Sequence, residues 1–228
     1  MAMHIKYLGH SSFMVQTLDK SILFDPFISP NPLASELKVE KLNPDYMFIS
    51  HGHDDHIADA IAIAKQSNCT CIGSWETEGW FKAQGIENTH SMNIGGKWAF
   101  DFGVIKITNA VHSSSFSSGQ AGGNPMGCVV QNAETCFYYS GDTALHMDMQ
   151  LIPKRFKLDL AFLPIGDNYT MDIDDAIEAS NFIDCDTVIG MHYNTFSPIE
   201  IDTTEAIERF KKQGKILLLP KIGEEITI

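Results

Sequence analysis

The chain has few basic side chains, and this scarcity limits the partners it can have. Its 228 residues include 16 Lys and Arg against 29 Asp and Glu, for a formal net charge of −13. A nucleic-acid binder needs Lys and Arg to displace phosphate counterions, and no basic run is present. We therefore expect no nucleic-acid partner. A phosphorylated small molecule stays compatible, because bound metal ions bring positive charge of their own.

Cysteines and long apolar runs are also few. Five cysteines fall at irregular spacings, and Cys69 and Cys71 stand too close for a zinc-binding C-x-x-C pair. No apolar run approaches the ~18 residues of a membrane span, and no charged segment followed by an apolar stretch opens the chain. We expect a soluble cytoplasmic protein with reduced thiols and no membrane partner. A homo-oligomer is compatible with this composition.

Length and periodicity predict one α/β domain over residues 1–228. Hydrophobic residues make up 44% of the chain, enough for a substantial core. An N-terminal hairpin precedes alternating strands and helices, which implies sheets covered by helices on their outer faces. The predicted elements that matter below are a hairpin of Met3–Leu8 and Phe13–Thr17, helices over Ile57–Gln66, 144–153 and Thr203–Lys212, and a last strand at Ile216–Leu219.

The densest group of metal-binding side chains is the segment 51–56, His-Gly-His-Asp-Asp-His. It follows the apolar run Tyr46–Ile49, which predicts a buried strand, and it precedes a helical pattern. Alternate residues of an extended chain point the same way, so His51 and His53 share one side, while the last two motif residues stand at the helix start. Two diverging ligand pairs suit two metal ions, which lie roughly 3.5–4 Å apart in two-metal hydrolytic sites.

This H-x-H-x-D-H pattern resembles the signature of the metallo-β-lactamase fold superfamily. The segments Leu8–Phe13 (LGHSSF) and Leu23–Phe27 (LFDPF) resemble the opening of its branch of L-ascorbate-6-phosphate lactonase-like proteins and predicted metal-dependent hydrolases. The resemblance implies a four-layer αβ/βα sandwich with ligands at successive strand ends. It also implies a first ion held by His51, His53 and His112, a second held by Asp55, His56 and His192, and Asp142 bridging both.

Each of these residues has an ordinary explanation when it is taken alone. A single histidine at a strand end, such as His112 or His192, is more often hydrogen-bonded than metal-bound. Asp142, in a Ser-Gly-Asp-Thr turn, suits a helix cap, and so do Asp54 and Asp55 in the motif. Only their joint occurrence, in the order that the resemblance implies, favours a metal centre.

The expected cofactors are two divalent metal ions. Imidazole with carboxylate suits zinc, our first choice, and also manganese, iron or nickel. Such a centre hydrolyses with a hydroxide of lowered pKa and needs no serine or cysteine nucleophile. Asp55 is the candidate catalytic residue, which would orient the hydroxide or receive its proton.

The predicted reaction is hydrolysis of an ester, lactone or related bond in a small-molecule substrate, phosphorylated ones included. A phosphodiesterase acting on a nucleotide, RNA end or phospholipid head group is the alternative. A diiron oxygen-reducing protein belongs to a third class. The resembled oxygen-reducing relatives carry Glu at the middle motif histidine, whereas this chain carries His53.

Further residues are candidates for supporting roles. His10, in a hairpin turn, is a candidate substrate contact or a turn cap, and Asn194 is a candidate substrate contact or a strand-end hydrogen-bond partner. Asp25 is a candidate acceptor for a ligand imidazole, and Gly52 is expected to allow a tight turn. Residues 113–127, with five serines and four glycines, are expected to form a lid or a plain surface connection. No role is assigned to His4, His90 and His146.

Overall fold

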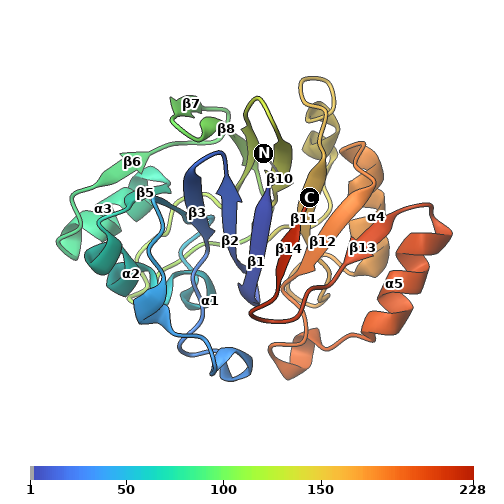
Figure 1. Cartoon of the computed structure of the whole chain (residues 1–228), viewed down its shortest axis with the longest axis horizontal. Coiled ribbons are helices and arrows are strands. Elements are labelled where there is room, and N and C mark those ends of the chain that lie inside the picture. Colours follow the sequence, from blue (N-terminus) through green and yellow to red (C-terminus); the bar gives the residue numbers. More distant parts are fainter. Residues whose placement is uncertain (1–2) are drawn as a thin grey trace.

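Two seven-stranded sheets form the centre of the computed structural model, which describes residues 3–228 (Figure 1). The first sheet has the order β14-β1-β2-β3-β4-β5-β6, and the second has the order β13-β12-β11-β10-β9-β8-β7. The strands of the first sheet are β1 His4–Gly9, β2 Ser12–Thr17, β3 Lys20–Phe24, β4 Tyr46–Phe48, β5 Thr70–Gly73, β6 Thr89–Ser91 and β14 Glu225–Thr227. Those of the second are β7 Lys97–Phe100, β8 Gly103–Asn109, β9 Met126–Gln131, β10 Cys136–Tyr139, β11 Leu160–Pro164, β12 Thr187–Met191 and β13 Ile216–Leu218.

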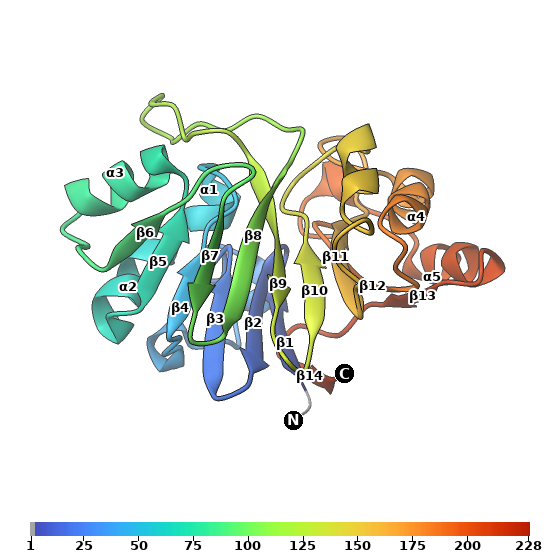
Figure 2. The same cartoon turned by 90° about the horizontal axis from the view of Figure 1, so that it is seen from above.

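Helices cover the outer face of each sheet, which confirms the predicted four-layer α/β sandwich (Figure 2). The first sheet carries α1 Asp54–Ile57, α2 Ala60–Ser67 and α3 Trp75–Ala83, and the second carries α4 Ile173–Phe182 and α5 Thr203–Lys212. Short 3₁₀ helices span Pro32–Ala34, Val39–Lys41, Met147–Leu151 and Ser197–Ile199. None of the helices within residues 3–228 is long and apolar enough to cross a membrane.

The main core lies between the two sheets, where alternate strand residues from both meet. Phe24 of β3 and Tyr139 of β10 are both fully buried, and their ring centroids lie 4.6 Å apart. Burying an aromatic side chain of this kind contributes roughly 1.5–3 kcal/mol relative to leaving it exposed. The packing of these rings fixes the distance between the sheets, and hence between the loops at their edges.

Strand directions bring the carboxyl ends of strands from both sheets to one edge of the sandwich. In the first sheet, β1 and β3 are both antiparallel to β2, and β4 is parallel to β3. In the second sheet, β8 and β10 are both antiparallel to β9, while β11 and β12 continue parallel to β10. The segments that follow β1, β3, β4, β8, β10 and β12 therefore leave their sheets at carboxyl ends, where polar side chains can gather.

Three elements differ from the sequence prediction. The helix expected over Ile57–Gln66 begins earlier and is divided at Asp59, whose buried carboxylate accepts hydrogen bonds from the backbone N–H groups of Ile28 and Ser29. The helix expected over 144–153 is only the 3₁₀ turn Met147–Leu151, because the Ala144 N–H donates to the Val111 carbonyl instead. Strand β14 was not predicted, since three residues are too few to show a period.

Candidate metal centre

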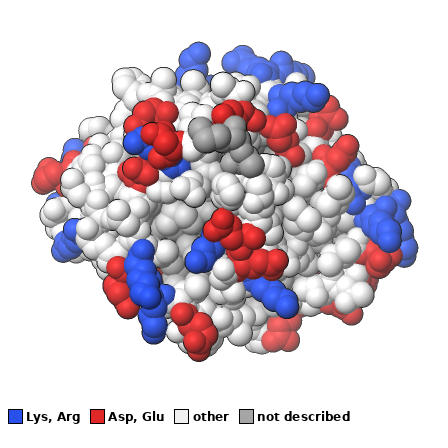
Figure 3. All heavy atoms as spheres, in the orientation of Figure 1, with Lys and Arg blue, Asp and Glu red and all other residues white. Residues whose placement is uncertain are grey.

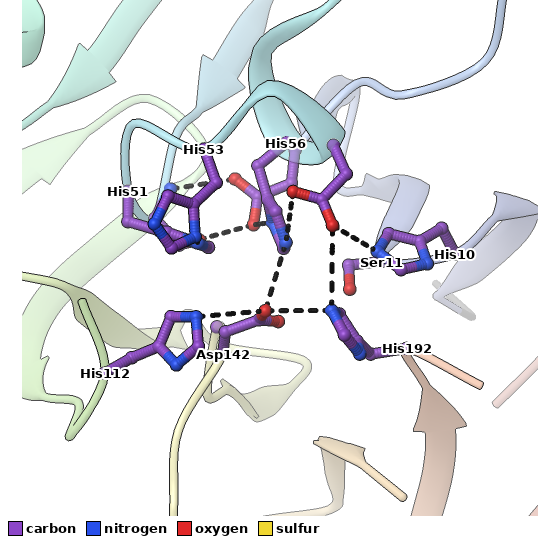
Figure 4. Close-up of polar contacts among 12 residues, drawn as sticks. His10, Ser11, His51, His53, His56, His112, Asp142 and His192 are labelled. Carbon is purple, nitrogen blue, oxygen red and sulfur yellow. Dashed lines mark hydrogen bonds and ion pairs between the residues drawn. The ribbon is translucent and has the colours of Figure 1, made fainter. Parts of the chain in front are cut away.

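The structure brings all seven predicted ligands to the shared edge of the two sheets (Figure 4). One group has ligand atoms that lie within 4.8 Å of one another and consists of His51, His53 and His112. A second group meets the same criterion and consists of His10, Asp55, His56 and His192. These groups match the two sets that the family resemblance implies for two ions, and the second group also contains His10.

Asp142 lies between the two groups. Its Oδ2 atom is 3.6 Å from Nε2 of His112, in the first group. The same oxygen is 3.3 Å from Nε2 of His56 and 3.0 Å from Nε2 of His192, both in the second group. The other oxygen, Oδ1, is buried and has no hydrogen-bond partner. A buried carboxylate oxygen without a partner is costly, so this position suits a carboxylate that binds cations.

Asp25 sets the tautomer of two candidate ligand rings. Its Oδ2 accepts hydrogen bonds from the Ser50 hydroxyl at 2.6 Å and from His56 Nδ1 at 2.8 Å. Because the Ser50 hydroxyl donates to Asp25, its oxygen accepts from His51 Nδ1, 2.9 Å away. Both rings therefore carry a proton on Nδ1 and direct Nε2 to the centre, where His56 would offer a lone pair once a metal ion replaces its second proton. This arrangement bears out the geometry expected for Asp25, since a metal-bound histidine usually donates its other N–H to such a group.

His53 is oriented by different contacts. Its Nδ1 lies 2.9 Å from Nε2 of His51, so the two nitrogens converge on one point. Its Nε2 lies 3.4 Å from the Ser113 hydroxyl, in the segment that follows His112. His53 therefore offers Nδ1 to the centre, in contrast to the Nε2 atoms of His51 and His56. The neighbouring sequence, His51-Gly52-His53, cannot reveal this difference.

Burial keeps the imidazoles of the first group neutral. It lowers the pKa of His51 well below its ordinary value, and it lowers the pKa of His53 and of His112. For His56, burial acts in the same direction, but the carboxylates of Asp142 and Asp25 outweigh it and raise the pKa well above the ordinary value. Neutral imidazole is the form that binds metal, and at His56 a metal ion would replace a proton.

The carboxylates are held in their ionised form. Burial acts to raise the pKa of Asp142, but His192 and His56 outweigh it and hold that pKa well below its usual range. Burial opposes ionisation of Asp55 as well, yet the hydrogen bond with His10 and the charge of His56 lower its pKa strongly. Neutral imidazoles, ionised carboxylates and an unpartnered carboxylate oxygen together form a donor set that fits divalent metal ions.

His10 is placed against Asp55 and is fully buried. Its Nε2 lies 3.2 Å from Asp55 Oδ2, and its Nδ1 lies 3.0 Å from the Thr195 hydroxyl. Because Asp55 is ionised, Nε2 carries the proton that is donated to it, and Nδ1 accepts from Thr195. The contact of His10 is thus with a candidate ligand. A contact with substrate stays a prediction.

Asn194 lies in the turn that follows His192, and its side chain is engaged there. The side-chain Oδ1 of Asn194 accepts a hydrogen bond of 2.7 Å from the Ile201 N–H. The backbone N–H of Asn194 donates to the Ile199 carbonyl. Its backbone has a positive φ of 54°, which asparagine tolerates better than most residues. The side chain therefore stabilises the turn, and its predicted role in substrate binding stays a prediction.

The segment 113–127 is folded over the metal-binding motif. The Gly52 N–H donates to the Ser114 hydroxyl, the Met126 N–H donates to the Ser50 carbonyl, and the buried Phe116 ring stacks on Trp80 with centroids 5.2 Å apart. Gly52 has no positive φ, and the backbone at 51–53 forms neither a turn nor a bend, so the tight turn predicted there is wrong. Its lack of a side chain matters instead for close approach, because a Cβ there would lie 3.1 Å from Gly122 Cα and 3.2 Å from Phe116.

Sequence reasoning did not find Ser50, Tyr139 and Thr195 as supporting residues. Tyr139 donates to Asp25 Oδ2 at 2.7 Å from a strand 114 positions away in the sequence. Only Ser50 had a signal, since it directly precedes the motif. The other two are brought in by the packing of the sheets.

Comparisons with known proteins agree with this geometry. The family model described as beta-lactamase superfamily domain matches residues 4–192. A UPF0173 metal-dependent hydrolase of Flavobacterium johnsoniae is 47% identical over 226 residues, which are 99% of this chain and all of that protein. A relative of the same name from Methylacidiphilum infernorum is 43% identical, again over 99% of this chain and all of the other.

Solved structures show the same fold over the whole chain. Igni18, described as a novel metallo hydrolase from Ignicoccus hospitalis, has a TM-score of 0.90 and 32% identity, and the match covers 100% of this chain and 99% of Igni18. An isothiocyanate hydrolase from Delia radicum gut bacteria has a TM-score of 0.80 and 21% identity, and the match covers 99% of this chain and 98% of that protein. The chain thus belongs to the UPF0173 metal-dependent hydrolases of the beta-lactamase superfamily.

Proposed function

We propose that the protein hydrolyses an ester, lactone or related bond of a small organic molecule, including phosphorylated ones, with a hydroxide held by two divalent ions. Zinc is the first choice of metal. The observation that carries this proposal is the position of Asp142 Oδ2, within 3.6 Å of imidazoles from both ligand groups. A single carboxylate shared in this way suits a dinuclear centre, with His51, His53 and His112 on one side and Asp55, His56 and His192 on the other.

Bound divalent ions would supply a hydroxide near neutral pH and polarise the scissile group. The protein supplies orientation around them. The pKa of Asp55 is held far below neutrality, so this carboxylate suits hydrogen bonding to the nucleophile better than storage of its proton. His10, fixed by Thr195, holds the Asp55 carboxylate in place.

The exposure of the centre gives the side from which substrate approaches. His51, His56, Asp142 and His192 are at most 2% exposed, whereas the side chains of Asp55 and His112 are 28% and 14% exposed. Val111, which directly precedes His112, and Phe196, whose ring centroid lies 5.4 Å from that of His10, both present apolar surface to solvent. Such a rim suits the apolar part of a small organic substrate.

The test is a substrate panel run on the metal-loaded protein in ¹⁸O-labelled water. The panel contains a lactone, a carboxylic ester, a thioester, a phosphodiester and an isothiocyanate, the last because one structural neighbour is an isothiocyanate hydrolase. We expect one label per product acid from a lactone or ester, and loss of turnover after metal removal. An adduct on a serine or cysteine during turnover, or full activity without metal, would overturn the proposal. Turnover of the phosphodiester alone, or consumption of oxygen with a reductant, would favour the alternatives.

A further inference from the structure

A cavity of about 400 Å³ lies on the outer face of the second sheet, away from the candidate metal centre. It is bounded by β8, by β10 and by residues 146–156, which include the 3₁₀ helix Met147–Leu151. Successive residues of β10 face opposite sides. Tyr139 packs between the sheets and bonds to Asp25, whereas Tyr138 packs on the outer face with Met149 and Ile152 and lines the cavity.

The inner end of the cavity holds buried polar atoms without partners. The Tyr138 side chain is fully buried, and its hydroxyl has no hydrogen-bond partner. The Thr108 hydroxyl lies near it, but it too has no partner within hydrogen-bonding distance. Both ring nitrogens of His146 are also buried without a hydrogen-bond partner, although the Asn109 backbone lies near the ring. Such groups cost free energy unless a partner arrives, and a built cavity can hold one.

The rim of the cavity is cationic in a protein of net charge −13. Lys106, Lys154 and Arg155 line it, against the single carboxylate of Asp148. Asp148 accepts from the Asn109 side chain, and Lys106 donates to the Gly95 carbonyl. Lys154 and Arg155 make no ion pair with any residue from 3 to 228. Figure 3 shows several basic side chains at the upper edge of the molecule, where Figure 1 places the segment before β11.

We propose that this cavity binds a small organic anion with an apolar, ring-like body. Its anionic group pairs with Lys154 and Arg155 at the rim. Its body contacts the apolar wall, which includes Met149, Ile152 and Phe156. A polar group at its far end hydrogen-bonds to the Tyr138 hydroxyl and to His146. The volume falls in the range of roughly 300–1,000 Å³ that small-molecule sites occupy.

The test uses 6-hydroxy-2-naphthoate, which has a carboxylate and a hydroxyl at opposite ends of an apolar ring system. Its binding to the metal-loaded protein is measured by calorimetry. We expect saturable binding that is about tenfold weaker for 6-hydroxy-2-naphthamide, which lacks the charge, and several-fold weaker for 2-naphthoate, which lacks the inner hydroxyl. Tyr138→Phe should weaken binding of the hydroxylated probe while leaving thermal stability unchanged or higher, because it removes an unpartnered buried hydroxyl.

A matched pair of variants separates this site from the metal ions, which also attract carboxylates. Lys154→Ala with Arg155→Ala should weaken binding about tenfold, whereas Lys65→Ala with Lys212→Ala, an equal loss of charge on helices α2 and α5 that do not line the cavity, should not. Equal affinity in both double variants would overturn the proposal, and so would absence of saturable binding at about 10 mM probe. Leu151 lies at the rim of the cavity. If Leu151→Glu converts an oligomer into monomers, the cavity is covered by a second copy of the chain, and this result would also overturn the proposal.

Discussion

Asp25 would touch no metal ion, yet it accepts four hydrogen bonds at the centre of the ligand arrangement. They come from the Ser50 N–H, the Ser50 hydroxyl, His56 Nδ1 and the Tyr139 hydroxyl. Two of the candidate ligands, His51 and His56, depend on this carboxylate for their tautomer. At the residue scale, the orientation of the ligands is therefore as informative as their identity.

We expect Asp25→Asn to lower metal affinity by about 10–100-fold, the usual cost of losing an outer partner of a ligand histidine. An amide has one acceptor oxygen and would present N–H groups to donors that need an acceptor. Affinity is measured by competition with a chromogenic chelator. The control is Asp59→Asn, which changes another buried carboxylate, one that accepts hydrogen bonds from two backbone N–H groups and bonds to no candidate ligand. Equal losses in both variants would contradict the assigned role.

His10 gives a prediction for the metal-free protein as pH changes. Burial, together with nearby His192, lowers its pKa to about 4, from an ordinary value of about 6.5. As pH falls, the unfolded chain takes up this proton near pH ~6.5 and the folded chain only near pH ~4. The free energy of unfolding that His10 contributes is therefore lost as pH falls through this window, by roughly 1.4 kcal/mol per pH unit.

His10→Gln should remove this contribution and flatten the pH slope by about that amount, as measured by urea unfolding between pH ~4.5 and ~6.5. His56, whose pKa is raised, gives the opposite slope, but it is present in both proteins and cancels in the comparison. His4→Gln, at a solvent-accessible histidine, is the control. An unchanged slope in His10→Gln would show that burial does not keep this imidazole neutral.

At the scale of elements, the segment 113–127 is held to the motif by Phe116 and by serine hydroxyls. Phe116→Ala should cost about 3–5 kcal/mol of stability and should change the ratio of kcat/KM values between substrates, because the segment then loses its anchor on Trp80. Metal content should stay the same, since Phe116 contacts no candidate ligand ring. Phe116→Leu, which keeps most of the apolar contact, should change both quantities less. Unaltered selectivity in Phe116→Ala would make the segment a plain surface connection.

Elements with a long regular pattern were predictable from the sequence, and those that depend on distant contacts were not. Helix α5 has the predicted bounds, Thr203–Lys212, because its acidic cap and apolar spacing are local. The 3₁₀ turn at Met147–Leu151 was not predictable, because Ala144, three residues before it, bonds to Val111 in the distant segment that follows β8. The same holds at the centre, where the motif and the family resemblance predicted the candidate ligands but not the supporting residues Tyr139 and Thr195.

At the scale of the whole molecule, the ligands come from both sheets, so metal binding should stabilise the sandwich as a unit. Ions that bind only the folded state, at a free concentration about 1,000 times their Kd, raise the free energy of unfolding by about 4.1 kcal/mol. For a chain of this size we expect Tm to rise by roughly 8–16 °C on metal binding. Tm is measured by scanning calorimetry. Chelator should reverse it, and the rise should shrink below pH ~6 as protons compete for the imidazoles. A Tm that is indifferent to metal would show that the ligands do not act together.

Anomalous diffraction from crystals of the metal-loaded protein, recorded on both sides of the metal absorption edge, tests the dinuclear centre most directly. We predict two peaks roughly 3.5–4 Å apart. One should be bound by His51, His53 and His112 and the other by Asp55, His56 and His192, with Asp142 between them. A single peak at full occupancy, with three of these six side chains left unbound in the presence of excess metal, would contradict the two-ion centre.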